Sequence, residues 1–288
     1  MRVPTALITR ALLTAVVAVV AAAPALADLE LPRLSPNATV SQVVGVTNVT
    51  ITYSRPGVKG RVIWGGLVPY GEVWRTGANE ATTITFGNDV TIDGHALPAG
   101  TYALMTIPGP DQWTVVFNKD AKQWGAYQYK AEQDALRITV KPEPAPFAER
   151  MTFSFPDTTS DATGVALTWD KLRVGFTVKV DTVGLVTAQA RTAVAAAKPD
   201  DWRTPLRAAT FCLDNNVDLA EARSWLDRSL TVKETMPGLA AKARFLALDG
   251  KKAEAIATAK KAIAVGKAAD PKAETGAVEK LIAEWEKP

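Results

Sequence analysis

The sequence predicts a β + α protein, in which a jelly-roll-like antiparallel β-sandwich domain is followed by a short all-α array. Near residue 181 the composition changes from Val, Thr, Ile, Tyr, Trp and Gly, which favour strands, to Ala, Lys, Leu and Glu, which favour helices. Before that point, short runs of alternating apolar and polar residues recur, roughly 8–12 residues apart, with turn residues between them. After it, an internal repeat relates Glu221 to Glu254 at an offset of 33 residues.

Residues 1–27 have the pattern of a bacterial export signal. Arg2 and Arg10 form a basic start, an apolar and uncharged run follows, and Ala25-Leu26-Ala27 has the small-x-small pattern that signal peptidase accepts. The apolar run is shorter than the about 20 residues that a membrane-spanning helix needs, so an uncleaved anchor is the less favoured alternative. We therefore expect a periplasmic or secreted protein, with a mature chain that begins at Asp28 and has no membrane span.

The charge and cysteine content argue against a nucleic-acid-binding protein and against a fold held by disulfides. Removing the export signal takes two arginines from the 33 Lys and Arg residues and leaves 31, against 30 Asp and Glu. No nucleic-acid partner is predicted, because binding a phosphate backbone needs a clustered basic excess. Cys212 is the only cysteine, so no disulfide forms within the chain, and its apolar neighbours predict a buried residue in a helix.

The β half, residues 28–180, contains a series of predicted strands. These are Val49–Tyr53, Thr83–Phe86, Val90–Ile92, Thr101–Ile107, Trp113–Phe117, Leu136–Val140, Met151–Phe155, Val165–Trp169 and Leu172–Val180. The turn residues 87–89 predict a hairpin between the second and third of these strands. The proline-rich residues 142–146 predict a stiff connector that crosses from one sheet edge to the other.

The helical half, residues 181–288, resembles tetratricopeptide repeats, whose period is about 34 residues. Two units of two helices each are predicted, with small residues where neighbouring helices touch. The first unit lacks the usual glycine turn, and both units lack the closing proline. We expect a last helix from Asp270 to Glu286, with Asp270 as its N-cap, to close the stack. We expect the repeats either to bind a protein partner or to pack on the sandwich.

The stretch from Tyr53 to Glu80 is the densest in polar and aromatic groups. Arginine offers a planar fork for carboxylate, phosphate or sugar hydroxyls, and aromatic rings offer flat faces. The predicted ligand-binding residues are Arg55, Lys59, Arg61, Tyr70, Trp74, Arg75, Asn79 and Glu80. In the alternative interpretation, the tryptophans pack in the core and the arginines pair with Glu72, Glu80 and Asp120 to brace the loops.

Specific motifs in this half resemble a known bacterial family. They are Tyr53-Ser54-Arg55-Pro56, Lys59-Gly60-Arg61, the run Leu67–Thr82, Pro98–Tyr102, and Phe117-Asn118-Lys119 with Trp124-Gly125. With them, residues 35 to about 180 resemble the family known as domain of unknown function 2911. The resemblance implies export, and some members carry a helical-repeat tail. It implies no activity.

We predict no catalytic residue, no metal site and no cofactor. His95 is the only histidine and lies on a predicted hairpin tip, and the sequence has no nucleophile elbow and no zinc motif. The favoured function is therefore an exported, non-catalytic module. Its sandwich would bind a polar ligand such as a carbohydrate or a cell-envelope glycan. The alternatives are an assembly protein that acts through its helices, and a carboxylate-based hydrolase that uses Glu72 and Glu80.

Overall fold

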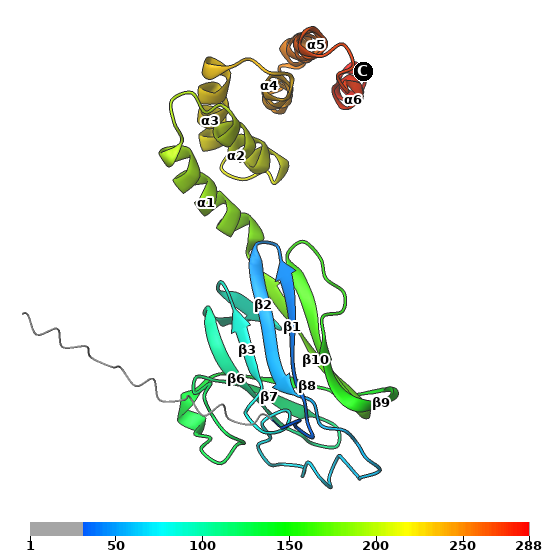
Figure 1. Cartoon of the computed structure of the whole chain (residues 1–288). Coiled ribbons are helices and arrows are strands. Elements are labelled where there is room, and N and C mark those ends of the chain that lie inside the picture. Colours follow the sequence, from blue (N-terminus) through cyan, green and yellow to red (C-terminus); the bar gives the residue numbers. More distant parts are fainter. Residues whose placement is uncertain (1–30, 288) are drawn as a thin grey trace, which may run out of the picture. The chain divides into compact units, whose positions relative to one another are not determined.

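The chain folds into two antiparallel sheets followed by helices, which confirms the predicted fold class (Figure 1). The computed structural model describes residues 31–287, so the predicted export signal lies outside the described residues. The first sheet has the order β1 (Asn37–Val44), β2 (Thr47–Ser54), β3 (Thr83–Phe86), β6 (Gly100–Ile107), β7 (Trp113–Asn118) and β8 (Asp134–Val140). The second has the order β5 (His95–Leu97), β4 (Val90–Ile92), β10 (Ala162–Val180) and β9 (Glu143–Ser154).

Alternation along each strand decides which side chains enter the core between the two sheets. In β2, Val49, Ile51 and Tyr53 are buried in that core. Thr50 and Thr52, which alternate with them, are only half-buried. The period of two places successive side chains on opposite faces, so the first sheet has an apolar inner face and a hydroxyl-bearing outer face.

Four tryptophans pack together inside the sandwich. Trp113 and Trp169 lie on strands and are each only 1% exposed. Trp64 and Trp74 come from the long loop between β2 and β3, and the rings of Trp64 and Trp113 have centroids 4.9 Å apart. Trp74 stacks on Trp169 at 5.9 Å. The long loop is therefore anchored in the core by its own aromatic side chains.

The predicted hairpin over residues 87–89 is wrong. β3 belongs to the first sheet and β4 to the second, so this turn carries the chain from one sheet to the other. Its polar groups bond to the β1–β2 hairpin instead: Asn88 Oδ1 accepts from Thr47 Oγ1 at 2.9 Å, and the Gly87 amide donates to the Asn48 carbonyl at 3.0 Å. Turn residues in a sequence show that the chain changes direction. Tertiary contacts decide which strand the next strand pairs with.

Other strands also differ from the prediction. The predicted strands include neither β1 nor β5. The two predicted strands within residues 165–180 form the single strand β10, whose register shifts around Asp170. The proline-rich connector is shorter than expected, because β9 begins at Glu143 and Pro144 pairs with Leu172. Proline is tolerated there because β9 is an edge strand.

The described helices follow the composition change. They are α1 (Thr182–Ala196), α2 (Arg203–Asp214), α3 (Leu219–Val232), α4 (Met236–Leu248), α5 (Lys252–Ala269) and α6 (Gly276–Trp285). The starts of α2 and α4 differ by 33 residues, as do those of α3 and α5. The last helix begins at Gly276 and not at Asp270, because Asp270 ends α5 by donating its amide to the Gly266 carbonyl at 2.9 Å.

Small side chains and one arginine hold the helices together. Ala222, Ala255 and Ala262 are fully buried. Arg228 of α3 donates to the carbonyls of Val194 at 2.7 Å and Ala197 at 2.8 Å, which lie at the C-terminal end of α1. Within residues 31–287, no helix is both long and apolar enough to cross a membrane.

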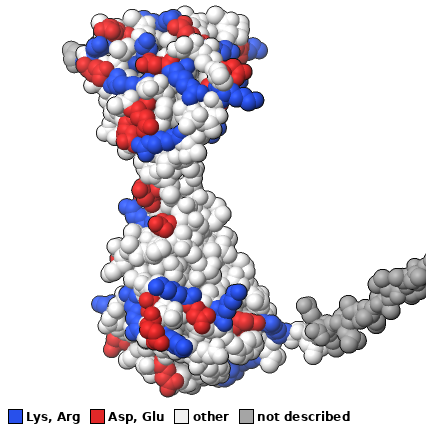
Figure 2. Space-filling model, turned by 90° about the vertical axis from the view of Figure 1, so that its left-hand side faces the viewer, with Lys and Arg blue, Asp and Glu red and all other residues white. Residues whose placement is uncertain are grey.

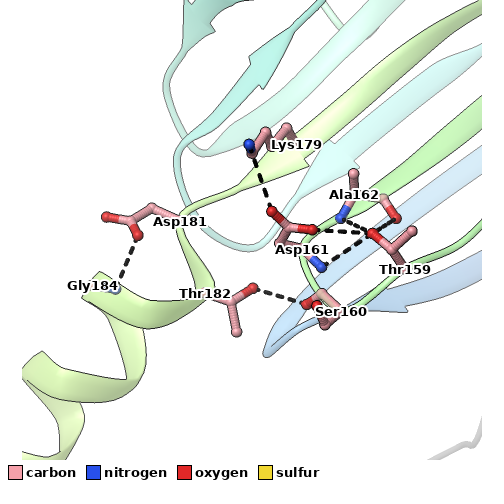
Figure 3. Close-up of polar contacts among 8 residues, drawn as sticks. All are labelled: Thr159, Ser160, Asp161, Ala162, Lys179, Asp181, Thr182 and Gly184. Atoms are coloured by element: carbon pink, nitrogen blue, oxygen red, sulfur yellow. Dashed lines mark hydrogen bonds and ion pairs between the residues drawn. The ribbon is translucent and has the colours of Figure 1, made fainter. Parts of the chain in front are cut away.

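β10 leads directly into α1 through Asp181 (Figure 3). The Asp181 carboxylate accepts from the Gly184 amide at 2.9 Å and so caps the helix. Thr182 donates its hydroxyl to the Ser160 carbonyl at 3.1 Å, and Lys179 lies 3.6 Å from the Asp161 carboxylate. These contacts tie the first turn of α1 to the loop between β9 and β10.

Candidate functional site

Two of the predicted binding arginines brace the protein backbone. Arg55 donates from Nε to the Met151 carbonyl at 2.9 Å and from its terminal nitrogen to Thr152 Oγ1 at 2.7 Å, which ties the long loop to β9. Arg61 donates to the carbonyls of Val58 and Gly57 within its own loop. The geometry gives both guanidinium groups a structural role.

The other residues of the long loop are spread between core and surface. Trp74 is buried among the four tryptophans and donates its indole N–H to the Gly77 carbonyl at 3.1 Å. The Tyr70 ring lies over Gly65, and Lys59 is exposed. Arg75 is half-buried, its Nε has no hydrogen-bond partner, and burial lowers its pKa while Tyr127 opposes that shift. These side chains do not converge on one cleft.

A pocket of about 480 Å³ lies where the end of this loop meets the segment after β7. The two segments pair: the Ala81 amide donates to the Gln123 carbonyl at 2.9 Å, and the Gly125 amide donates to the Asn79 carbonyl at 3.1 Å. This pairing sets Glu80 opposite Trp124. The lining residues are Asn37, Thr52, Tyr53, Ser54, Glu80, Ala81, Thr83, Ala121, Lys122, Gln123 and Trp124.

Asn79 supports one wall of the pocket from behind. Its backbone has a φ of 58°, a left-handed conformation that asparagine adopts more readily than most residues. Its side-chain amide donates to the Ser35 carbonyl and to Ser54 Oγ, both at 3.3 Å. Asn79 therefore positions Glu80 and does not itself line the pocket.

Gln123 lines the pocket, and its side-chain amide is held by the protein. Its side chain is nearly fully buried, with 4% exposure, and its Nε2 donates to Asn118 Oδ1 at 3.1 Å and to the Asp120 carbonyl at 2.7 Å. Because both partners are acceptors, the amide orientation is fixed and the oxygen cannot take the place of the nitrogen. Gln123 Oε1 is buried without a hydrogen-bond partner in the protein. Such a group normally pairs with water or a ligand.

Trp124 supplies the aromatic surface of the pocket. It is 60% exposed, an unusual state for so large an apolar side chain. Lys122 and Glu80 add one charge of each sign to the lining. The pocket therefore combines a flat aromatic face and hydroxyl groups with one charge of each sign.

Sequence reasoning found part of this pocket. Glu80 is among the predicted binding residues and lines it, and Trp124 belongs to the family motif Phe117-Asn118-Lys119 with Trp124-Gly125. The reasoning missed Thr52, Thr83 and Gln123. The two threonines read as ordinary outward positions of strands, and the unpaired oxygen of Gln123 depends on contacts that no sequence pattern encodes.

Comparison with known proteins identifies the β half. The family model described as "Protein of unknown function (DUF2911)" matches residues 35–178, which is half of the 288-residue chain. The match spans both sheets, from just before β1 to within β10, and the helices lie outside it. Searches of curated proteins and of solved structures gave no match.

Proposed function

Because the chain belongs to the family of proteins of unknown function DUF2911, whose description names no activity, we propose its function from the pocket: it binds a polar ligand of the sugar class and leaves it chemically unchanged. One observation supports this above all others. An exposed indole, two threonine hydroxyls and one charge of each sign meet in one pocket of about 480 Å³.

The chemistry of a sugar fits these groups. A sugar ring presents C–H groups on one face, which pack on an aromatic ring such as Trp124, and hydroxyls around its edge. The hydroxyls of Thr52 and Thr83, which line the pocket, can donate to and accept from such ligand hydroxyls. A few fixed polar groups beside an aromatic surface are the usual composition of a small-molecule site.

The lining favours binding over hydrolysis. A glycoside hydrolase of the common type needs two carboxyl groups on either side of the bond that breaks. Among the described residues that line the pocket, Glu80 is the only carboxylate, and Glu72 is exposed and lies outside the lining. His95, the single histidine, is exposed on β5. The proposal is therefore a non-catalytic module.

The pattern of residues 1–27 supports export, so the proposed place of action is the periplasm or the cell exterior, where cell-envelope glycans occur. In this proposal the helices hold a protein partner. The 33-residue offset between successive helix pairs supports a repeat array of the tetratricopeptide kind.

Glycan-array screening of the mature chain, followed by titration calorimetry of the best ligand, tests the proposal. Trp124→Ala is expected to weaken binding at least tenfold, which corresponds to about 1.4 kcal/mol. Tyr127→Ala is the matched control, because Tyr127 lies in the same segment, is 87% exposed and does not line the pocket. Absence of any saccharide ligand, or equal binding by Trp124→Ala and the native protein, would reject the proposal.

A second candidate function is assembly through the helices. A hollow of about 780 Å³ in the helical array is lined mainly by α1 and α2. Its lining includes apolar residues such as Ala193, Leu206 and Phe211 as well as polar and charged ones such as Arg207 and Asp214. Ala193→Glu places a charge in it, and Ala188→Glu places one elsewhere on the exposed surface of α1. If the helices carry the function, Ala193→Glu loses co-purifying partners that Ala188→Glu keeps. Identical partner sets for both variants count against this candidate.

A further inference from the structure

Resting on the proposed function, we infer that the ligand is a neutral polysaccharide strand that lies across the outer face of β1, β2, β3 and β6, with the pocket holding only one of its sugars. The inference depends on three features of the first sheet: its lack of charge, its rows of hydroxyl groups and the continuity of those rows with the pocket.

The first sheet is uncharged over most of its width. The strands β1, β2, β3, β6 and β7 contain no Asp, Glu, Lys or Arg, although these residues make up 22% of the chain. Figure 2 views the molecule from the side on which β3 and β6 lie in Figure 1, and charges there gather at the ends of the sandwich and leave an uncharged band between them.

The two long strands of the second sheet have no such bias, although the short strands β4 and β5 also contain no Asp, Glu, Lys or Arg. The long strands β9 and β10 contain charged residues of both signs, namely Glu143, Glu149, Arg150, Asp170, Lys171, Arg173 and Lys179. Solubility alone therefore does not explain the uncharged first sheet, since surfaces are normally mixed and charged. A neutral ligand does explain the lack of charge. A charged side chain under such a ligand would lose its bound water and gain no partner of opposite charge.

Two rows of hydroxyl groups cross the strands on this face. The register places Thr39, Thr52 and Thr83 side by side in one row. The second row contains Ser41, Thr50, Thr85 and Thr101. Adjacent strands lie about 4.8 Å apart, so four strands give a row on the order of 15 Å long. That length accommodates several linked sugars.

The hydroxyls are held in place and keep hydrogen-bonding capacity. Thr39 and Thr52 bond to each other at 3.1 Å, and Thr85 and Thr101 at 2.9 Å. Each hydroxyl has one proton and two lone pairs, so a pair that shares one proton still offers another proton and free lone pairs. An ordered set of donors and acceptors suits a ligand made of repeating hydroxyl groups.

The first row continues into the pocket. Thr52 and Thr83 belong to the row and also line the pocket, and Trp124 stands in the same lining. Thr50 and Thr85 belong only to the second row and lie outside the lining. Substitutions at Thr50 and Thr85 therefore change the outer face of the sheet without changing the lining of the pocket.

The test compares neutral β-glucan oligosaccharides, from the disaccharide to the hexasaccharide, with the acidic polymer polygalacturonate by calorimetry. Native protein is expected to bind longer neutral chains at least tenfold more tightly than the disaccharide, and the acidic polymer weakly. The double variant Thr50→Val/Thr85→Val keeps β-branched side chains but removes two hydroxyls. This variant should bind the longer chains no more tightly than the disaccharide, and its affinity for the disaccharide should equal that of the native protein. Thr177→Val, on the exposed face of β10, is the control.

Each outcome supports or overturns the inference. Binding that depends on Trp124 but not on chain length overturns it and leaves the proposed function in place. Preference for the acidic polymer, or an unchanged length dependence in the double variant, also overturns it. Absence of binding to every saccharide overturns both proposals. Thermal unfolding of each variant, with a Tm near that of the native protein, shows that lost binding does not come from unfolding.

Discussion

Replacing Gly45 with alanine tests how the β1–β2 hairpin meets the first turn of α1 (Figure 3). Gly45 has a φ of 57°, and a Cβ added there would overlap the Thr182 hydroxyl and lie 2.7 Å from its methyl carbon. The positive φ costs an L-residue about 1–2 kcal/mol, and forcing a methyl group into filled space costs about 1–3 kcal/mol. We therefore expect Gly45→Ala to lower the free energy of unfolding by roughly 2–5 kcal/mol.

A double-mutant cycle measured by urea unfolding separates these two contributions. Thr182→Ala removes the overlapping hydroxyl and methyl groups, so Gly45→Ala should cost at least about 1 kcal/mol less in that background. Gly94→Ala is the control for backbone strain, because Gly94 has a φ of 86° and open space around its missing Cβ. If Gly45→Ala costs the same in both backgrounds and no more than Gly94→Ala, the packing argument is refuted.

Arg228→Ala removes the donor to the last carbonyls of α1 and should lower the free energy of unfolding by about 2 kcal/mol, whereas Lys260→Ala at an exposed ion pair should change it by at most about 1 kcal/mol. Burial and the Asp134 carboxylate raise the pKa of Tyr129 above its usual 10.0. The contribution of Tyr129 to the free energy of unfolding is therefore full below about pH 10 and is lost as the pH rises through the folded-state pKa. If Tyr129→Phe leaves the alkaline pH dependence of stability unchanged, this expectation is contradicted. Burial raises the pKa of the Cys212 thiol, so a thiol reagent should label it much more slowly in native protein than in urea, and equal rates would disprove its burial.

Local patterns predicted most of the secondary structure but not its pairing. The alternation in Val49–Tyr53 fixes which side chains can be buried together, and this depends only on the period of two in a strand. The turn residues 87–89 look the same whether the next strand returns to its own sheet or crosses to the other. That choice depends on bonds from Asn88 and Gly87 to the β1–β2 hairpin, which is distant in sequence.

The composition change near residue 181 coincides with the end of β10 and the start of α1. The helix α1 itself was missed because its sequence lies outside the 33-residue offset. The start of α6 was misplaced because Asp270-Pro271 is a good helix start in isolation. In the structure, the Asp270 amide is already used to end α5.

Sequence by itself determined that aromatic and polar groups crowd the segment before residue 81, and it determined the family through the motifs there. It did not determine which of these groups face solvent. Arg55 and Arg61 bond to backbone carbonyls and Trp74 enters the core, because the core and the loop carbonyls need those groups to satisfy burial and hydrogen bonding. Only the tertiary structure brings Gln123 and Trp124 into one pocket with Thr52, because Thr52 pairs with Thr83 and Ala81 bonds to Gln123. No local pattern records either long-range contact.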